Sequence, residues 1–255
     1  MTRLTFLGTG TSQGVPVIGC QCDVCRSVDP KDNRLRSSVL FEDNGTSLIV
    51  DAGPDFRQQL LREKISDLDA ILLTHEHKDH TGGLDDIRAI NYIKRKILPV
   101  YCEKRVLESL KKEYSYAFDD LKYPGAAEFD IKIIGNKIFE IGNSVIMPVR
   151  VYHYKLPVLG FRIGNIAYIT DANYIPDEEF EKLHNLDVLV INTVRRERHI
   201  SHFSLDEAIS VAQKTKAKTT YLTHLSHQIG KNETLAAMLP EGIHPAYDGL
   251  KVISY

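Results

Sequence analysis

The densest group of potential metal ligands in this chain is four side chains within six positions, His75-Glu76-His77-Lys78-Asp79-His80. The run follows an apolar stretch and precedes two glycines, which is typical of a strand that enters a tight loop and then a helix. In an extended segment the first two histidines share a face, because side chains alternate with period two. A bend after Lys78 would turn the aspartate and third histidine toward a neighbouring point. The run therefore predicts two adjacent cations rather than a solvated, histidine-rich loop.

Three of the four cysteines form a second cluster, Cys20-Gln21-Cys22-Asp23-Val24-Cys25. These residues are too close in sequence for comfortable mutual disulfides. In a reducing compartment, the C-x-C-x-x-C spacing is typical of three zinc thiolates that need a fourth ligand, with redox or incidental cysteines as the alternative. Cys102 lies in an apolar strand pattern, so we expect an ordinary core residue.

Composition favours an ordinary soluble globular protein. The chain has 255 residues, of which 43% are hydrophobic and 26% charged, enough for a substantial core in a single domain, 1–255. A net charge of −2 gives no general attraction to nucleic acid or anionic membranes. Residues 1–8 have a strand pattern without the apolar core of a secretion signal, and no apolar run reaches membrane-spanning length. We expect a cytoplasmic protein with reduced thiols.

The periodicity predicts a mixed α/β fold of two sheets with helices outside. Predicted helices cover 56–63, 84–94, 104–114, 177–183, 205–215 and 232–238, and Ser204 with Glu207 has the form of a capping box. Predicted strands cover 3–7, 38–42, 47–51, 70–74, 100–102, 131–134, 145–152, 160–163, 167–170, 188–192, 219–222 and 252–254.

Five of these apolar strands end in, or are directly followed by, an aspartate or a histidine. One such residue would more often be a hydrogen-bonded turn residue. Strand ends at one edge of a sheet sandwich can gather side chains into a single cleft, so the repetition favours a site. The five residues are Asp51, His75, His153, Asp171 and His224.

With these residues in place, the chain resembles the metallo-β-lactamase superfamily, whose αββα sandwich carries HxHxDH at its metal site. The resemblance extends from Phe6-Leu7-Gly8-Thr9-Gly10 to Ala246-Tyr247-Asp248-Gly249. It is closest to the PhnP-type cyclic phosphodiesterases, which share the Gly-x-Pro-x-x-Gly-Cys-x-Cys-x-x-Cys element found here at 14–25. HxHxDH alone identifies only the superfamily, whereas its combination with C-x-C-x-x-C and His224-x-x-His227 is more specific.

The resemblance implies two metal ions in the active site and one structural zinc. One active-site ion would be bound by His75, His77 and His153, the other by Asp79, His80 and His224, with Asp171 bridging them. Imidazole and carboxylate ligands suit Mn²⁺ or Zn²⁺. Cys20, Cys22, Cys25 and His227 would hold the structural zinc and staple a loop at about 14–26.

The resemblance also implies roles around the metals. His202 would be a general acid for the leaving group, a role that suits its titration range, with Asp79 as the second catalytic residue. Asp51 would orient a metal-binding histidine, and Asp248 a site histidine as well. His199 has no clear family counterpart and is expected at the surface. Three loop arginines could contact phosphate or form a solvated charge run: Arg195, Arg196 and Arg198.

The predicted function is a phosphodiesterase acting on a small cyclic phosphate, for example a ribosyl 1,2-cyclic phosphate; family resemblance also suggests a homodimer. A tRNase Z-like RNA-processing enzyme is the first alternative, but such enzymes carry a long arm where this chain has only residues 154–170. A PqqB-like, non-hydrolytic cofactor-biosynthesis protein is the second, disfavoured by the intact ligand set. β-Lactamase activity is disfavoured because Asp171 stands where many of those enzymes have cysteine. Glyoxalase II-like thioester hydrolysis is disfavoured because we expect no C-terminal helical domain of the glyoxalase II kind.

Overall fold

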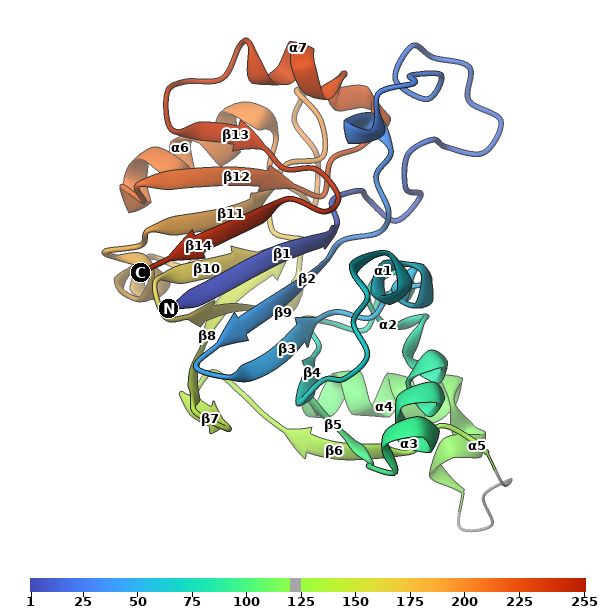
Figure 1. The fold of residues 1–255 in the computed structure, drawn as a ribbon. Helices are drawn as coiled ribbons and strands as arrows, with labels where there is room; N and C mark the ends of the chain where they lie inside the picture. The colour runs from blue at the N-terminus through green and yellow to red at the C-terminus, as the bar shows by residue number, and fades with distance from the viewer. Residues whose placement is uncertain (120–124) are drawn as a thin grey trace.

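Two seven-stranded sheets pack face to face in this computed structural model, which describes residues 1–119 and 125–255 (Figure 1). The first sheet has the order β14 (Lys251–Ser254), β1 (Thr2–Gly8), β2 (Ser38–Asp43), β3 (Thr46–Val50), β4 (Ala70–Leu72), β5 (Leu98–Cys102), β6 (Phe129–Ile133). The second has the order β13 (Ile243–Pro245), β12 (Thr219–Thr223), β11 (Val188–Asn192), β10 (Ile166–Ile169), β9 (Leu156–Ile163), β8 (Ser144–His153), β7 (Phe139–Ile141).

The helices cover the outer faces of the two sheets. The first sheet is covered by α1 (Phe56–Glu63), α3 (Arg88–Lys94), α4 (Lys104–Glu113) and α5 (Ser115–Phe118), and the second by α6 (Leu205–Thr215) and α7 (Asn232–Ala236). The one-turn helix α2 (Lys78–Thr81) follows β4. Short 3-10 helices occupy Pro30–Asp32, Leu84–Ile87, Asp177–Leu183 and His227–Ile229. Ser204 caps α6 in a complete capping box with Glu207, as the sequence predicts.

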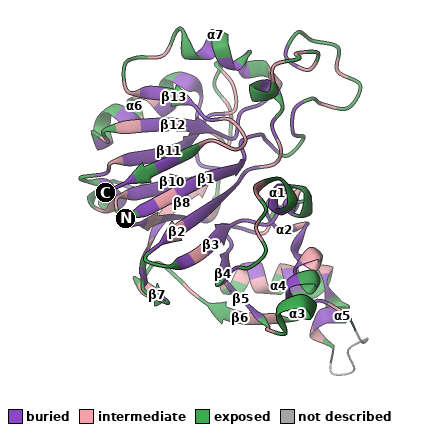
Figure 2. Cartoon of the chain, viewed as in Figure 1, coloured by how far each residue is buried: buried purple, intermediate pink, exposed green. Residues whose placement is uncertain are grey.

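Strand alternation produces three apolar layers. Along β2, Phe41 packs between the sheets while Leu40 packs under the helices of the first sheet. Along β11, Val190 faces the space between the sheets and Ile191 faces α6. Most strand residues are buried, whereas α3 and α4 have exposed outer faces (Figure 2). This four-layer arrangement is the predicted αββα sandwich.

Strand direction explains why the site residues meet. β3 and β4 run parallel, and so do β10, β11 and β12. β8 is antiparallel to β9, which is antiparallel to β10, so β8 and β10 share a direction. The carboxyl ends within each of these groups therefore reach one edge of their sheet, and the residues that follow them can converge.

The predicted elements are present, and the differences lie in short segments. The predicted helix 84–94 is a 3-10 turn followed by α3, and 177–183 is a 3-10 helix. The sequence pattern missed β7 and β13, each only three residues long, and the one-turn helices α2 and α5. Within the described residues, none of the helices has the length and apolar character needed to span a membrane.

Candidate metal centres

Three of the five strand-end residues have left-handed backbone conformations. Asp51, Asp171 and His224 have φ values of 65°, 53° and 56°. Residues other than glycine adopt this region rarely, and such residues cluster at functional sites. Asn192, which ends β11, fixes the turn after Asp171 because its side-chain amide accepts a bond from the Ala172 N–H (2.8 Å) and donates to the Ala172 carbonyl (3.0 Å).

The histidine run bends, but one residue earlier than the predicted bend after Lys78. His77 has extended backbone (φ −62°, ψ 148°) and α2 begins at Lys78, so the run changes direction between its second and third ligands. Close backbone packing supports this turn. A Cβ on Gly83 would lie 2.0 Å from the Gly53 carbonyl oxygen, so only glycine fits there.

The run and the strand ends converge on Asp171. Three groups of potential ligand atoms, each mutually within 4.8 Å, all include this carboxylate. Asp171 is 2% exposed and shares ligand groups with histidines from the run at 75–80, from the end of β8, from the loop after β11 and from the end of β12, so one carboxylate can serve two neighbouring cations. The groups are Asp79, His80, Asp171, His224; His75, His77, Asp171; and His153, Asp171, His202.

His153 differs somewhat from its expected position. Its ring centroid lies 5.9 Å from that of His75 and 5.2 Å from that of His77, but only 4.5 Å from that of His202. His153 therefore lies closer to His202 than to His75 and His77, the two residues with which it is predicted to share a cation.

Hydrogen bonds outside the ligand groups orient the rings. Asp51 Oδ2 accepts from His80 Nδ1 at 2.6 Å and also receives the Thr74 hydroxyl at 2.9 Å. Because that hydroxyl donates to Asp51, it accepts from His75 Nδ1 (2.9 Å). His153 Nδ1 donates to the Ser201 carbonyl at 2.8 Å. In all three rings Nδ1 is engaged outside the ligand groups, so Nε2 is the nitrogen available to a cation; Nε2 of His75 lies 2.9 Å from Nδ1 of His77.

The electrostatics suit a divalent cation. Nε2 of His80 is buried with no hydrogen-bond partner among the described residues, 3.3 Å from an oxygen of Asp79 and of Asp171. Burial would lower the pKa of His80, but the carboxylates of Asp171, Asp79 and Asp51 raise it well above its usual value. Burial would raise the pKa of Asp171, but His224 and His80 outweigh it and keep that pKa well below its usual range. Such a mixed imidazole and carboxylate set fits Zn²⁺ or Mn²⁺.

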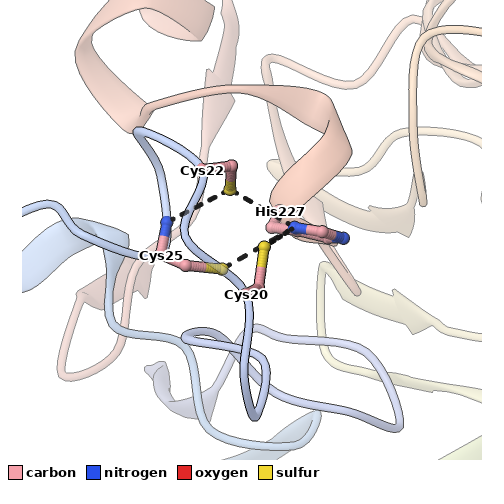
Figure 3. A group of neighbouring side chains, drawn as sticks. All are labelled: Cys20, Cys22, Cys25 and His227. Atoms are coloured by element: carbon pink, nitrogen blue, oxygen red, sulfur yellow. Dashed lines mark hydrogen bonds between the residues drawn. The ribbon is translucent and has the colours of Figure 1, made fainter.

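The cysteine cluster meets His227, which begins the 3-10 helix His227–Ile229 (Figure 3). Nδ1 of His227 lies 3.3, 3.4 and 3.6 Å from the sulfurs of Cys20, Cys22 and Cys25. Tetrahedral zinc, with Zn–S of about 2.3 Å and Zn–N of about 2.0 Å, requires nitrogen–sulfur separations of about 3.5 Å. The four residues therefore fit a closed structural zinc site.

A buried ion pair, not recognised in the sequence, connects this cluster to the rest of the fold. Arg34 is 1% exposed, pairs with Asp32 (3.4 Å), and donates to the carbonyls of Ser226 and Gly230 at 2.9 Å each. These carbonyls flank the turn that carries His227. In the sequence Arg34 lies in the polar run 31–36 (Lys-Asp-Asn-Arg-Leu-Arg), which is typical of a solvated segment, so only the structure identifies its burial. Cys102 is fully buried in the core, as predicted.

Two sequence predictions need correction. Among the described residues Asp248 contacts no site histidine: its carboxylate accepts from Thr9, the Leu35 N–H and Arg62. The Asp248 carboxylate therefore connects the turn at 247–249 to the residue after β1, to Leu35 and to α1. It can do so because this turn packs against the end of β1, where the Gly249 N–H donates to the Phe6 carbonyl. His199 is half-buried rather than a free surface residue, with its Nδ1 3.2 Å from Nδ1 of His202.

His202 lies at the mouth of the site. Its Nε2 is 3.4 Å from Asp171 Oδ2, and its side chain is 12% exposed. Beside it a cavity of about 520 Å³ opens along one flank of the site. The cavity is lined by His77, His153, Tyr154, Lys155, Leu156, Ile200 and Ser201.

Of the loop arginines, Arg195 donates to the Arg198 carbonyl, and the side chain of Arg198 is 91% exposed.

Comparison with known proteins agrees with this geometry. The family described as beta-lactamase superfamily domain matches residues 46–225, so the chain belongs to the metallo-β-lactamase superfamily. Within it the chain is PhnP-like: it resembles the crystal structure of a diphosphatase from the PhnP family, with a TM-score of 0.92 and 40% identity over 98% of this chain and 96% of that one. The chain thus has a metallo-β-lactamase fold of the PhnP type.

This chain matches only part of the length of two further relatives. An octanoyltransferase of Porphyromonas gingivalis is 41% identical over 98% of this chain, which spans 51% of that longer protein. A coenzyme PQQ synthesis protein B of Methylobacterium radiotolerans is 33% identical over 100 residues, 34% of this chain and 33% of that protein.

Proposed function

We propose that this protein is a metal-dependent phosphodiesterase acting on a small cyclic phosphate, with a ribosyl 1,2-cyclic phosphate as an example. The observation that carries the proposal is the position of Asp171, which belongs to three ligand groups at once beside an open cavity of about 520 Å³. A shared carboxylate fits a pair of cations, and paired cations are a recurring arrangement in phosphodiester hydrolysis.

The residues around the cavity have separate tasks in this proposal. When bound, two divalent cations would supply positive charge to the phosphoryl oxygens and acidify the attacking water. His75, His77 and His153 would hold one cation and Asp79, His80 and His224 the other, with Asp171 between them. Asp171 shares a ligand group with His75 and His77, with His153, and with the second set. As water adds to phosphorus, the bond to a ribose oxygen breaks. His202, next in sequence to the cavity residue Ser201, would give that oxygen a proton from Nε2.

The cavity wall supports a small phosphate compound rather than a long polymer. Lys155 provides a cation beside the His153 flank, and Tyr154 and Ile200 provide exposed apolar surface (53% and 69%). Residues 154–170, where tRNase Z enzymes carry their arm, consist mainly of β9 and β10. Nothing in this segment extends outward to grip an RNA.

Cleavage of a diphosphate is a second candidate, because the PhnP-family relative of 40% identity is described as a diphosphatase. The two reactions share attack on phosphorus but differ in the leaving group. A phosphate leaving group needs little protonation, whereas a ribose oxygen needs an acid. The requirement for His202 therefore separates the two candidates.

Acyl transfer is not part of the proposal, despite the name of the Porphyromonas relative. This chain corresponds to about half of that protein, and its convergent side chains are metal ligands suited to hydrolysis. We propose that transfer of the octanoyl group belongs to the part of that relative which this chain does not match. A PqqB-like role is not proposed either, because the PQQ synthesis protein matches only 34% of this chain.

Turnover of defined substrates tests the proposal. Protein loaded with Mn²⁺ or Zn²⁺ should hydrolyse bis(p-nitrophenyl) phosphate and a nucleoside or ribosyl cyclic phosphate. A chelator should abolish activity and added metal should restore it. Cleavage of a dinucleoside diphosphate alone would favour the second candidate. Absence of turnover on every phosphodiester at full metal occupancy would refute the phosphodiesterase assignment.

A further inference from the structure

His199 and His202 face each other within one short, closed loop. The loop follows β11 and is closed at its base, where the Leu205 N–H donates to the Arg195 carbonyl at 3.0 Å. Within it, the two Nδ1 atoms lie 3.2 Å apart and the ring centroids 5.0 Å apart. This is the distance of a hydrogen bond, and it requires that one ring donates and the other accepts.

The backbone determines the direction of this bond. The Ser201 N–H lies 3.3 Å from His199 Nδ1, and a backbone N–H can only donate. His199 Nδ1 therefore presents its lone pair, and His202 Nδ1 must carry the hydrogen that points at it.

We propose that His199 is a positioning residue that fixes the tautomer and orientation of His202, so that His202 presents Nε2 alone to the metal centre. Nε2 of His202 lies 3.4 Å from Asp171 Oδ2. The ring itself is stacked on His224 (centroids 4.9 Å apart, interplanar angle 15°) and lies edge-on to His153. Packing fixes the plane of the ring, and His199 selects which nitrogen is engaged.

This inference rests on the proposed role of His202 at the leaving oxygen. A histidine with one nitrogen engaged by an acceptor exchanges protons only through the other, and orienting partners of this kind recur in catalytic histidines. The Ser201 hydroxyl, 3.2 Å from His202 Nδ1 and 3.4 Å from His199 Nδ1, is the competing acceptor. A test must therefore compare the two acceptors.

The experiment compares His199→Phe, which removes the acceptor, with His199→Asn, which retains one, and with Ser201→Ala. Long-range ¹H–¹⁵N correlation spectra of the zinc-loaded protein should show neutral His202 protonated at Nδ1 in the wild type, in His199→Asn and in Ser201→Ala. In His199→Phe this preference should be lost. Zinc content should be equal in all four proteins.

Kinetics provide the second measurement. Loss of one hydrogen bond predicts a kcat/KM for an alkyl or cyclic ribose phosphate lower by roughly 2- to 10-fold in His199→Phe. The p-nitrophenyl diester should be unaffected, and His199→Asn should recover most of the rate. In a His202→Ala background, His199→Phe should have no further effect.

Several results would overturn the inference: wild-type His202 protonated at Nε2 when neutral, an unchanged tautomer in His199→Phe, loss of the tautomer in Ser201→Ala, or an additional rate loss on top of His202→Ala. Failure of the proposed function is a separate result. If no phosphodiester is hydrolysed, the kinetic arm is lost, but the spectra still decide whether His199 fixes the His202 ring.

Discussion

The two candidate metal centres are built on different kinds of structure. The centre around Asp171 draws its side chains from the ends of β8, β10 and β12 and from the run after β4, and its His75 and His80 are fully buried. The Cys₃His cluster lies on a loop without regular structure and a 3-10 turn, and Cys22 is exposed. Sheets and hydrogen bonds position the first centre, whereas we expect the second to depend on a bound zinc ion to define the loop. We therefore expect metal loss to affect chemistry at the first centre and stability at the second.

The largest effect should come from Asp171→Ala. Because this carboxylate belongs to every ligand group of the centre, its loss should reduce the affinity for both cations. The decrease in activity should exceed the roughly 10–100-fold that loss of an outer hydrogen-bond partner costs. Metal content by elemental analysis and kcat/KM measure this. Asp177→Ala, at a carboxylate that is 92% exposed, is the matched control. Unchanged metal content and activity in Asp171→Ala would remove it from the centre.

His202→Ala should slow an alkyl or cyclic ribose phosphate by about 10²–10⁴-fold and leave the metals bound, because a general acid matters when the leaving oxygen is poor. A p-nitrophenyl diester should lose much less activity. Rates on both substrates with metal content distinguish the roles, and His184→Ala, at a histidine half exposed on the surface, is the control. Equal slowing at full occupancy would make His202 an electrostatic or orienting residue, and reduced metal content would make it a ligand.

Asp51→Asn should weaken the centre without dismantling it. Asp51 orients His80 directly and His75 through Thr74, so its substitution should reduce metal affinity or activity by roughly 10–100-fold. Titration of metal-free protein with Zn²⁺ measures the affinity. Asp248→Asn provides a comparison, because that carboxylate contacts Thr9, Leu35 and Arg62 instead of a ligand. If Asp248→Asn weakened metal binding as much as Asp51→Asn, the corrected role of Asp248 would be wrong.

Cys22→Ser should have the smallest effect on chemistry and a clear effect on stability. The variant should lose the structural zinc and melt at a lower temperature, since a structural zinc contributes directly to folding. For a chain of this size each kcal/mol lost lowers Tm by about 2–4 °C. Cys102→Ser, at the buried core cysteine, should retain the zinc. A Cys22→Ser protein with unchanged zinc content and Tm would refute the structural assignment.

The sequence predicts the buried centre well because its signals are local. Apolar strands, each followed by Asp or His, place Asp51, His75 and His224 near one another once parallel strands are assumed. A bend within the histidine run follows from the strand, the glycines and the ligand spacing, although the structure has it one residue earlier than predicted. The fold class follows from the same strand and helix periodicities, together with the family resemblance.

The remaining contacts are not predictable from local pattern. Arg34 pairs with Asp32 but contacts carbonyls at 226 and 230, a relationship set only by tertiary packing. Asp248 is an aspartate after an apolar segment like Asp51, yet its turn lies against β1 and not at the cleft. His199 looks like a surface residue until the closure of its loop brings it to His202. In each case, side-chain direction depends on long-range contacts that leave no periodic trace.

A metal titration tests the central claim most directly. Protein stripped by mild chelation, which should leave the Cys₃His zinc in place, is titrated with Mn²⁺ while phosphodiester turnover and bound metal are measured together. If Asp171 joins two cations in one catalytic centre, turnover should follow the second equivalent bound in the cleft and remain low after the first. Full turnover at a single equivalent, or none with two bound, would contradict a dinuclear phosphodiesterase.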